Sequence, residues 1–365
     1  MRRPASGGSA VVVKVGSSSL TGPKGGIDPQ RVVAIVEQVD ALWGAGHPTI
    51  LVSSGAVAAG LPALGLQRRP TDLPALQVAA AVGQGKLMEI YTRELGVRGR
   101  VAGQVLLTRD VLANRGQYLH AREALERMLS LGVVPVVNEN DTVVVDELRL
   151  GDNDRLAAIV SHLVSAGMLV ILTDTQGLFS DDPRLSDEAE LLTAVRHTDE
   201  ILDELHRSSR ASGFGSGGVA TKVSAARMAA WSGIPTVIAE AGRADAALVA
   251  VQGGDVGTWV EPHSSRLTAR KLWIAFGLRT EGSLAVDAGA AAAIVRSGAS
   301  LLPAGIASHA GSFEAGAAVE VTADGRIIAK GLTRIGSADV TTLRGTHTSV
   351  AGGAVIHRDD LVVFG

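Results

Sequence analysis

The chain has 365 residues, of which 46% are hydrophobic and 19% are charged, a composition that indicates a buried globular interior and, at this length, two domains. The formal net charge of −3 gives no broad positive field that would collect nucleic acid or an anionic membrane. Cysteine is absent, which excludes disulfides, thiolate catalysis and thiolate metal sites.

The N-terminus carries no recognisable export signal. Arg2 and Arg3 could open a signal peptide, but Lys14 interrupts the apolar stretch that follows them. The longest apolar runs elsewhere fall far short of the roughly 20 residues that a membrane-spanning helix needs. We therefore expect a cytoplasmic protein without a membrane segment.

The first 260 residues alternate short β-branched runs with longer amphipathic segments, a pattern that predicts βα units. The predicted fold class is α/β, with a mainly parallel sheet sandwiched by helices. The predicted strands span residues 10–15, 49–53, 101–107, 133–137, 169–173 and 236–239. The predicted helices span residues 29–43, 73–95, 117–131, 152–164 and 221–231.

The pattern of the sequence changes after Trp259. Residues 261–279 are predicted to be a linker that ends in a short apolar piece, and residues 280–365 a small, mostly β domain. Its predicted strands span residues 283–286, 318–321, 327–329 and 354–357, with a short helix at 288–296. Residues 280–365 contain six Arg or Lys against eight Asp or Glu, a net charge of −2.

Two lysines lie beside glycine-rich turns. Lys14 belongs to the first predicted strand, which runs directly into Gly16 and three serines, and Lys222 follows the sequence GFGSGGVAT at the start of a predicted helix. Such turns can direct backbone N–H groups at phosphate oxygens while a lysine neutralises their charge. Each turn could also be an ordinary loop, and the coupling of the second turn to a helix and Lys222 makes it the stronger signal. Neither turn has the spacing of a P-loop.

Asparagine, aspartate and serine close or open several predicted elements. Ser53 and Ser54 end the second strand, and an ordinary helix N-cap would also explain them. The sequences NEND at residues 138–141 and GDND at 151–154 hold more Asx residues than a turn and a cap require. Amides and carboxylates of this kind suit the ammonium and carboxylate groups of a free amino acid, and acidic side chains can also hold Mg²⁺.

The remaining polar residues carry weaker signals. Thr173 and Asp174 close an apolar strand, and the pair Asp182-Pro183 beyond them is typical of a turn. The nine histidines show no metal-ligand spacing. Two lysines with glycine turns suit phosphoryl transfer, which relies on positioning and charge stabilisation and needs no general base when the acceptor is a carboxylate.

Six motifs in one order closely resemble the glutamate 5-kinases of the amino acid kinase family. They read VKVGSSSL, VSSGAVAAG, PVVNENDTV, GDNDRLAA, LTDTQGLFSDDPR and GSGGVATKVSAA. The resemblance spans about residues 10 to 260 and implies a catalytic amino acid kinase domain at 1–260. The tail resembles the PUA domain that many bacterial members carry.

The resemblance implies roles for individual residues. Lys14 and Lys222 would stabilise the charge on the transferred phosphoryl group, and Asp154 would orient both lysines. Glutamate would be held by Ser54, Asp141 and Asn153, with Asn138 lining the same pocket. The implied ATP-binding residues are Lys14, Thr173, Asp174, Ser216, Gly217, Gly218, Val219, Ala220, Thr221 and Lys222.

The same resemblance implies the reaction and its partners. ATP would phosphorylate the γ-carboxylate of L-glutamate to L-glutamyl 5-phosphate, the first step of proline biosynthesis, and proline would inhibit. Mg²⁺ would bind through the ATP phosphates and not in a direct protein cage. A homo-oligomer, either a dimer or a tetramer, is implied as well. The glycine-rich loop has Val-Ala before Thr221, where the family often has Met-Ser or Met-Ala, a change that leaves backbone contacts intact.

Three alternatives make different demands on the sequence. An RNA-binding regulator would need a basic face on residues 280–365, which their net charge of −2 does not provide, so RNA binding is not expected. A kinase for acetylglutamate or aspartate would need other pocket residues. A nicotinamide enzyme would need a Gly-x-Gly-x-x-Gly turn after the first strand, and Gly16 begins no such series.

Overall fold

The computed structural model describes residues 2–23, 25–112, 114–143, 153–211, 218–264, 266–346 and 353–364. Contacts divide the chain into two compact units, residues 1–266 and 267–365. The predicted domain limits, 1–260 and 280–365 with a linker between them, rest on composition and stay a prediction. Among the described residues, no helix combines the length and the apolarity that a membrane span requires.

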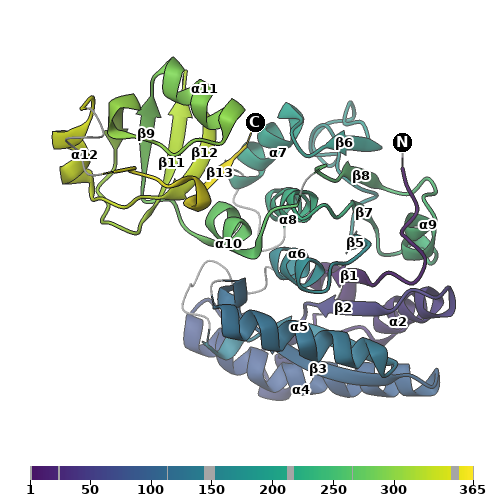
Figure 1. The fold of residues 1–365 in the computed structure, drawn as a ribbon. Helices are drawn as coiled ribbons and strands as arrows, with labels where there is room; N and C mark the ends of the chain where they lie inside the picture. The colour runs from purple at the N-terminus through teal and green to yellow at the C-terminus, as the bar shows by residue number, and fades with distance from the viewer. Residues whose placement is uncertain are drawn as a thin grey trace. The chain divides into compact units, whose positions relative to one another are not determined.

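Unit 1 is built on an eight-stranded sheet whose order is β3-β4-β2-β1-β5-β7-β8-β6 (Figure 1). The strands from β3 to β7 in this order run parallel, β8 is antiparallel to β7, and β6 is parallel to β8. The strands are β1 (Val11–Val15), β2 (Thr49–Ser53), β3 (Val101–Leu107), β4 (Val133–Glu139), β5 (Met168–Thr173), β6 (Ala194–Arg196), β7 (Thr236–Glu240) and β8 (Thr258–Glu261).

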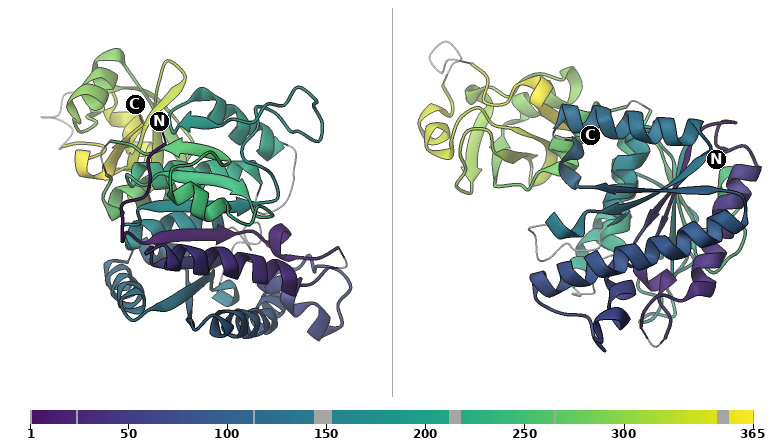
Figure 2. Two further views of the ribbon diagram at one scale, coloured as in Figure 1. Left: turned by 90° about the vertical axis from the view of Figure 1, so that its right-hand side faces the viewer. Right: turned by 90° about the horizontal axis from the view of Figure 1, so that it is seen from below.

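Helices cover both faces of this sheet, as the right-hand view of Figure 2 shows for α4 and α5. Every residue of β1, β2 and β5 is buried, which explains why these strands read as continuous apolar runs. The α-helices of unit 1 are α1 (Ser17–Leu20), α2 (Pro29–Gly44), α3 (Ala56–Gly60), α4 (Leu73–Val97), α5 (Arg115–Ser130), α6 (Asn153–Leu163), α7 (Glu200–Ala211), α8 (Val219–Trp231) and α9 (Ala246–Val251). The 3-10 helices of this unit are η1 (Pro62–Leu64), η2 (Arg109–Leu112) and η3 (Asp141–Val143).

Local sequence fixes where the long helices begin. Asp28 caps α2 by accepting a hydrogen bond from the backbone N–H of Gln30, and Asp72 caps α4 in the same way through Ala75. In both helices a proline occupies the first turn, where its missing N–H costs no hydrogen bond. These caps set the start of the two helices that cover one face of the sheet.

Glycine allows α3 to lie directly against α4. A Cβ atom on Gly83 would come within 1.8 Å of the carbonyl oxygen of Ala56, and one on Gly60 within 2.0 Å of that of Ala79. The preceding turn also needs glycine, because Gly55 has a φ of +101°, in the left-handed region. This close approach packs the segment that follows β2 against the middle of α4.

Unit 2 is built on a five-stranded, mostly antiparallel sheet in the order β10-β9-β11-β12-β13. Its strands are β9 (Gly282–Val286), β10 (Ile306–Ala310), β11 (Ala318–Ala323), β12 (Arg326–Leu332) and β13 (Leu361–Val363). Its α-helices are α10 (Ala269–Leu272), α11 (Ala288–Ser297) and α12 (Ser337–Leu343), with the π-helix η4 (Trp273–Gly277) and the 3-10 helices η5 (Pro303–Gly305) and η6 (Arg358–Asp360). Ile274 and Ala275 of η4 pack with Val362 of β13, so this segment belongs to the unit's own interior.

The predicted α/β fold class and the mostly β C-terminal domain are confirmed. All six strands predicted before residue 260 are present within about two residues of their limits, and so are the five helices, although residue 152 lies outside the described residues. The strand predicted at 354–357 is wrong, because Ile356 forms only an isolated bridge with Leu301. Its apolar side chains signalled burial and not strand pairing, since Val355 and Ile356 are both buried.

Candidate active site

The polar residues singled out in the sequence gather at the carboxyl ends of the central strands. In β1, Lys14 pairs in register with Val52 of β2 and Ile171 of β5, so the chain continues past Val15 beside Ser53 on one side and Leu172 on the other. Parallel strands present their carboxyl ends at one edge, and ligands of open α/β sheets bind there. The sheet order therefore brings together the ends of β4, β2, β1 and β5.

A buried cluster of three charges lies at this edge. Lys14 Nζ lies 2.5 Å from Asp154 Oδ1, and Lys222 Nζ lies 3.6 Å from Asp154 Oδ2. Asp154 is 0% exposed, Lys14 2% and Lys222 8%. One carboxylate thus faces two ammonium groups that come from β1 and α8, and the three charges sum to +1.

The ionisation of the cluster follows from burial and mutual attraction. Burial by itself would raise the pKa of Asp154, but the charges of Lys14 and Lys222, with hydrogen bonds from Lys14 and Thr221, hold the pKa below its ordinary value. Burial lowers the pKa of Lys222, against the opposing influence of the Asp154 charge. The charge of Asp154 therefore favours the charged form of Lys222.

The start of α8 completes this side of the site. Thr221 Oγ1 donates to Asp154 Oδ2 at 2.7 Å, which ties the first turn of α8 to the first turn of α6. Gly218 is the N-cap and offers no side-chain cap, so the positive end of the helix dipole is not occupied by a capping side chain. Of the residues predicted in this loop, 218–222 are placed here, whereas Ser216 and Gly217 lie outside the described residues.

Asn153, the neighbour of Asp154, organises a second, uncharged cluster. Its Nδ2 shares two protons among three acceptors, which are Ser54 Oγ at 3.0 Å, the carbonyl oxygen of Ser53 at 3.0 Å and Asn138 Oδ1 at 2.7 Å. Its Oδ1 is buried and has no hydrogen-bond partner among the described residues. The structure therefore brings the predicted residues Ser54, Asn138 and Asn153 into direct contact.

Asp141 lines a pocket of about 320 Å³ beside this cluster. Gln84 of α4 lines the same pocket and connects it to the cluster, because Asn138 Nδ2 donates to Gln84 Oε1 at 2.8 Å. Sequence reasoning missed Gln84. The feature of the sequence that could have indicated Gln84 is its position as a polar residue on a face of α4 that is otherwise formed by apolar residues such as Ala80, Leu87 and Tyr91.

Thr173 and Asp174 lie at the end of β5, on the other side of β1 from Ser53. Thr173 is buried, and its Oγ1 donates to Asp174 Oδ1 at 3.1 Å. The exposed Asp174 carboxylate is close enough to raise the pKa of Lys222. No group of three or more His, Asp or Glu side chains that could hold a metal ion occurs within the described part of the chain.

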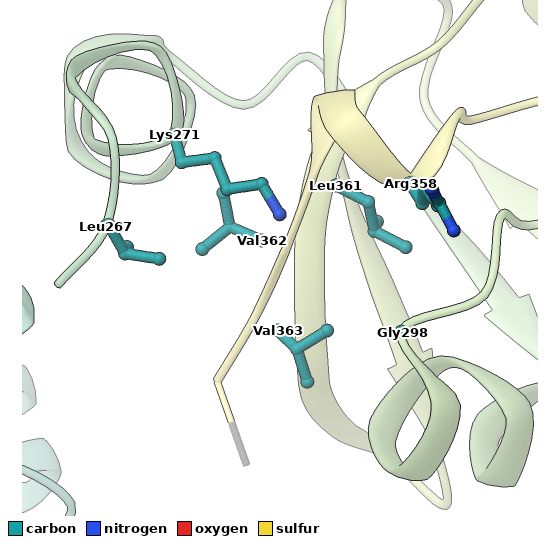
Figure 3. A pocket seen from close by; sticks show the side chains of 7 residues that line it. All are labelled: Leu267, Lys271, Gly298, Arg358, Leu361, Val362 and Val363. Carbon is teal, nitrogen blue, oxygen red and sulfur yellow. The ribbon is translucent and has the colours of Figure 1, made fainter. Parts of the chain in front are cut away.

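A smaller pocket of about 160 Å³ lies within unit 2 (Figure 3). It is lined by Leu267, Lys271, Gly298, Arg358, Leu361, Val362 and Val363. Its walls are mainly aliphatic, and its charged side chains are Lys271 and Arg358. It has no counterpart of the buried carboxylate and amides around Asn153 and Asp154. No residue predicted from the sequence to act in the site lies here.

The first turn of α6 joins two kinds of chemistry. Asp154 faces two lysines whose excess positive charge suits the phosphates of a nucleotide, while Asn153 faces hydroxyl and amide groups that suit the ammonium and carboxylate of a small amino acid. A phosphoryl donor and a carboxylate acceptor can therefore bind side by side across one helix terminus.

Comparisons with known proteins agree with this arrangement. A sequence model of the amino acid kinase family matches residues 9–240, and one of the PUA domain matches residues 282–350. Glutamate 5-kinases from Frankia casuarinae and Geobacter sp. are 47% and 46% identical, over 97% of this chain and 96% and 97% of theirs. The one from Marinomonas sp. is 43% identical over the full length of both chains.

A solved structure supports the fold. The UMP kinase of Bacillus anthracis superposes with a TM-score of 0.50 at 13% identity, covering 73% of this chain and all of that one. At this identity the likeness bears on architecture and not on substrate. Together with the sequence matches over residues 9–240 and over nearly the whole length of the relatives, it shows that the chain belongs to the amino acid kinase family.

Proposed function

We propose that the chain transfers the γ-phosphoryl group of ATP to the γ-carboxylate of L-glutamate, giving L-glutamyl 5-phosphate, the first intermediate on the route to proline. The observation that carries this proposal is the first turn of α6, where Asp154 holds two lysines and Asn153 holds Ser54 and Asn138. The identity of 42–47% to proteins named glutamate 5-kinase over nearly the whole chain supports the choice of acceptor.

The lysines would act on the phosphoryl group in flight. An oxygen of the glutamate carboxylate forms a bond to the γ-phosphorus while the bond from phosphorus to the β–γ bridging oxygen breaks, and ADP leaves with that electron pair. Lys14 and Lys222 would stabilise the negative charge on the equatorial and leaving oxygens, and Asp154 would fix both lysines in place. No proton has to be removed, because the acceptor is already ionised.

The uncharged cluster would bind glutamate. The buried Oδ1 of Asn153 would accept a hydrogen bond from the substrate ammonium group, and the Asp141 carboxylate in the adjoining pocket would add charge attraction. Ser54 accepts from Asn153, so its own proton stays available for a substrate carboxylate. This division assigns phosphoryl transfer to one side of α6 and acceptor recognition to the other.

ATP would bind along the ends of β1 and β5 and the start of α8. The proposed contacts are Lys14, Thr173, Asp174 and the loop from Ser216 to Lys222, in which the backbone N–H groups at the helix start face the phosphates. Mg²⁺ would be held mainly by the ATP phosphates, and it would neutralise charge on them as the γ-phosphoryl group leaves. Asp174, an exposed carboxylate whose charge acts on Lys222, would support the ion or its waters.

We extend the proposal to inhibition, assembly and location. Proline, which shares the ammonium and α-carboxylate groups of glutamate, would inhibit by competing for the same cluster. A dimer or tetramer is proposed because edge strand β3 leaves Val101 63% and Leu106 41% exposed. Because its substrates would be ATP and free glutamate, we place the protein in the cytoplasm. Residues 280–365, whose net charge is −2, are not assigned an RNA partner.

The test is to trap the product. Purified protein is incubated with Mg-ATP, glutamate and hydroxylamine, which converts an acyl phosphate into a stable hydroxamate. We expect glutamate-dependent hydroxamate with one ADP released per hydroxamate formed, and loss of both in Lys222→Ala. Proline should raise the apparent KM for glutamate and leave the KM for ATP unchanged. ADP release without hydroxamate would contradict a carboxylate acceptor.

A further inference from the structure

The hydrogen-bond network around Asn153 continues to a tyrosine that has no place in the proposed chemistry. Tyr91 of α4 is fully buried, and its hydroxyl lies 2.8 Å from Ser53 Oγ. Ser53 Oγ has one proton and a carbonyl acceptor, that of Ser54, at 3.0 Å, and we therefore assign Tyr91 as the donor in the Tyr91–Ser53 hydrogen bond. Burial raises the pKa of Tyr91, which keeps this proton in place at physiological pH.

Ser53 and Ser54 connect the tyrosine to the proposed substrate-binding groups. Asn153 Nδ2 donates to the carbonyl oxygen of Ser53 and to Ser54 Oγ, so the orientation of its amide depends on where the end of β2 lies. The same amide orientation places Asn153 Oδ1, the buried acceptor without a partner among the described residues. A shift at Ser53 would therefore move the groups proposed to receive glutamate.

Two side chains of helix α4 hold this hydrogen-bond network, one at each end of the network. Gln84 accepts from Asn138, which in turn accepts from Asn153, while Tyr91 donates to Ser53. The two α4 residues are seven positions apart, which is two helical turns, so they lie on the same face of the helix. One buried helix face thus fixes the end of β4 through Gln84 and the end of β2 through Tyr91.

The structure assigns to Tyr91 the role of a positioning residue for the acceptor half of the site. It touches none of the three charges Lys14, Asp154 and Lys222 in any described contact, and it reaches Ser54 and Asn153 only through Ser53. Its hydroxyl restricts Ser53 to one hydrogen-bonding geometry and thereby presets Ser54 and Asn153 for glutamate. The assignment rests on the proposed function, because it takes glutamate as the ligand of this cluster.

The decisive variant is Tyr91→Phe, which removes one oxygen and keeps the ring that packs in the core. We expect the KM for glutamate to rise roughly fivefold to thirtyfold, the effect of losing one buried hydrogen bond and loosening its neighbours. The kcat and the KM for ATP should stay within about twofold of wild type, because the lysine side of α6 is not in this network. Tyr118→Phe, which alters the chain's other tyrosine, on α5, is the matched control and should change neither KM.

A double-mutant cycle separates positioning from general loosening. If Tyr91 acts through Ser53, then adding Tyr91→Phe to a Ser53→Ala variant should change the KM for glutamate by less than about twofold. Independent, multiplicative effects of the two changes would overturn the assignment. An unchanged KM for glutamate in Tyr91→Phe would also overturn the assignment. So would a general loss in Tyr91→Phe, in which the KM values for glutamate and ATP rise, kcat falls and the melting temperature drops.

The inference and the proposed function can fail separately. Wild-type turnover of glutamate tests the function, whereas the ratio of KM values between Tyr91→Phe and wild type tests the positioning role. A glutamate-binding titration of both proteins by calorimetry, in the presence of a non-hydrolysable ATP analogue, gives the same ratio without turnover. Equal dissociation constants in that titration would overturn the role of Tyr91.

Discussion

Replacing Asp154 by asparagine removes the carboxylate that lies between two buried lysines while keeping the shape of the side chain. The charge of the cluster changes from +1 to +2 with Lys14 and Lys222 still buried. Removing one partner of a buried ion pair typically costs about 3–5 kcal/mol, because it leaves an uncompensated charge. Asparagine keeps an oxygen that can accept from Thr221, so we expect the lower end, about 3 kcal/mol.

Urea or thermal unfolding of the free protein measures this loss. For a unit of this size, about 3 kcal/mol corresponds to a melting temperature lower by roughly 6–10 °C. The control is Asp203→Asn, which breaks the exposed ion pair with Arg227 (2.6 Å) and should cost less than about 1 kcal/mol. Because the folded pKa of Asp154 lies below its unfolded value, the difference from wild type is present above that unfolded pKa and should disappear as pH falls through the folded pKa.

The same variant should separate catalysis from nucleotide binding. We expect kcat to fall by about 10²-fold, the cost typical of misplaced catalytic groups. At a pH where both lysines are charged, ATP affinity should hold because a repelling carboxylate is gone. Burial lowers the pKa of Lys222 and the Asp154 charge opposes it, so the variant should lose more of its charged lysine and should recover activity at lower pH. A variant that melts like Asp203→Asn and keeps wild-type kcat would refute the role of Asp154.

Three further predictions concern other parts of unit 1. Burial, with the charges of Arg266 and Arg122, lowers the pKa of His162 to about 4. The folded protein therefore disfavours protonation of this side chain, and wild-type stability should fall by about 3 kcal/mol between pH 6.5 and pH 4. Urea unfolding should show this loss in wild type and in the control His120→Gln, which alters an exposed histidine, but not in His162→Gln. Gly83→Ala should lower the free energy of unfolding by about 1–3 kcal/mol, because its Cβ would overlap the Ala56 carbonyl. The control Gly85→Ala, on the same helix, meets nothing within 4 Å and should be neutral or stabilising by up to about 1 kcal/mol. Equal effects of the two changes in thermal unfolding would refute the α3–α4 contact. Asp141→Ala should raise the KM for glutamate roughly tenfold or more, with a smaller change in kcat, because a charged hydrogen bond to the substrate is lost. A change confined to the KM for ATP in steady-state kinetics would argue against a role of Asp141 in glutamate binding.

The central strands could be predicted because burial on both faces leaves a clear sequence signal. β2 matches its predicted limits of 49–53, and β1 and β5 each differ by one residue. The edge strand β3 also matches its limits of 101–107, although Val101 and Leu106 are exposed. Strands β6 and β8 were missed because they have only three and four residues, too few for a clear apolar run in the sequence. They form the edge of the sheet at which β8 runs antiparallel to β7. Helix α7 was missed although Leu202 and Leu205 give it a buried stripe, because the surrounding segment reads as polar loop.

The charged half of the site was visible in the sequence, whereas its supporting network was not. Lys14 and Asp154 each lie in a motif that also marks a strand end or helix start. Tyr91 and Gln84 lie in the middle of a helix with no motif, and their partners are 38 and 54 residues away along the chain. Only the strand order, which places β2 between β4 and β1, brings those partners beneath one face of α4.

The most direct test of the central claim is a competition among acceptors. Hydroxamate formation is measured with Mg-ATP and hydroxylamine for L-glutamate, N-acetyl-L-glutamate and L-aspartate, each alone and in mixtures of equal concentration. The proposed site predicts that kcat/KM for glutamate exceeds that of either other acid by at least about 10²-fold, since their backbone groups or chain length cannot satisfy Asn153 and Asp141 together. Equal or better turnover of N-acetylglutamate or aspartate would contradict the assignment of glutamate as the acceptor.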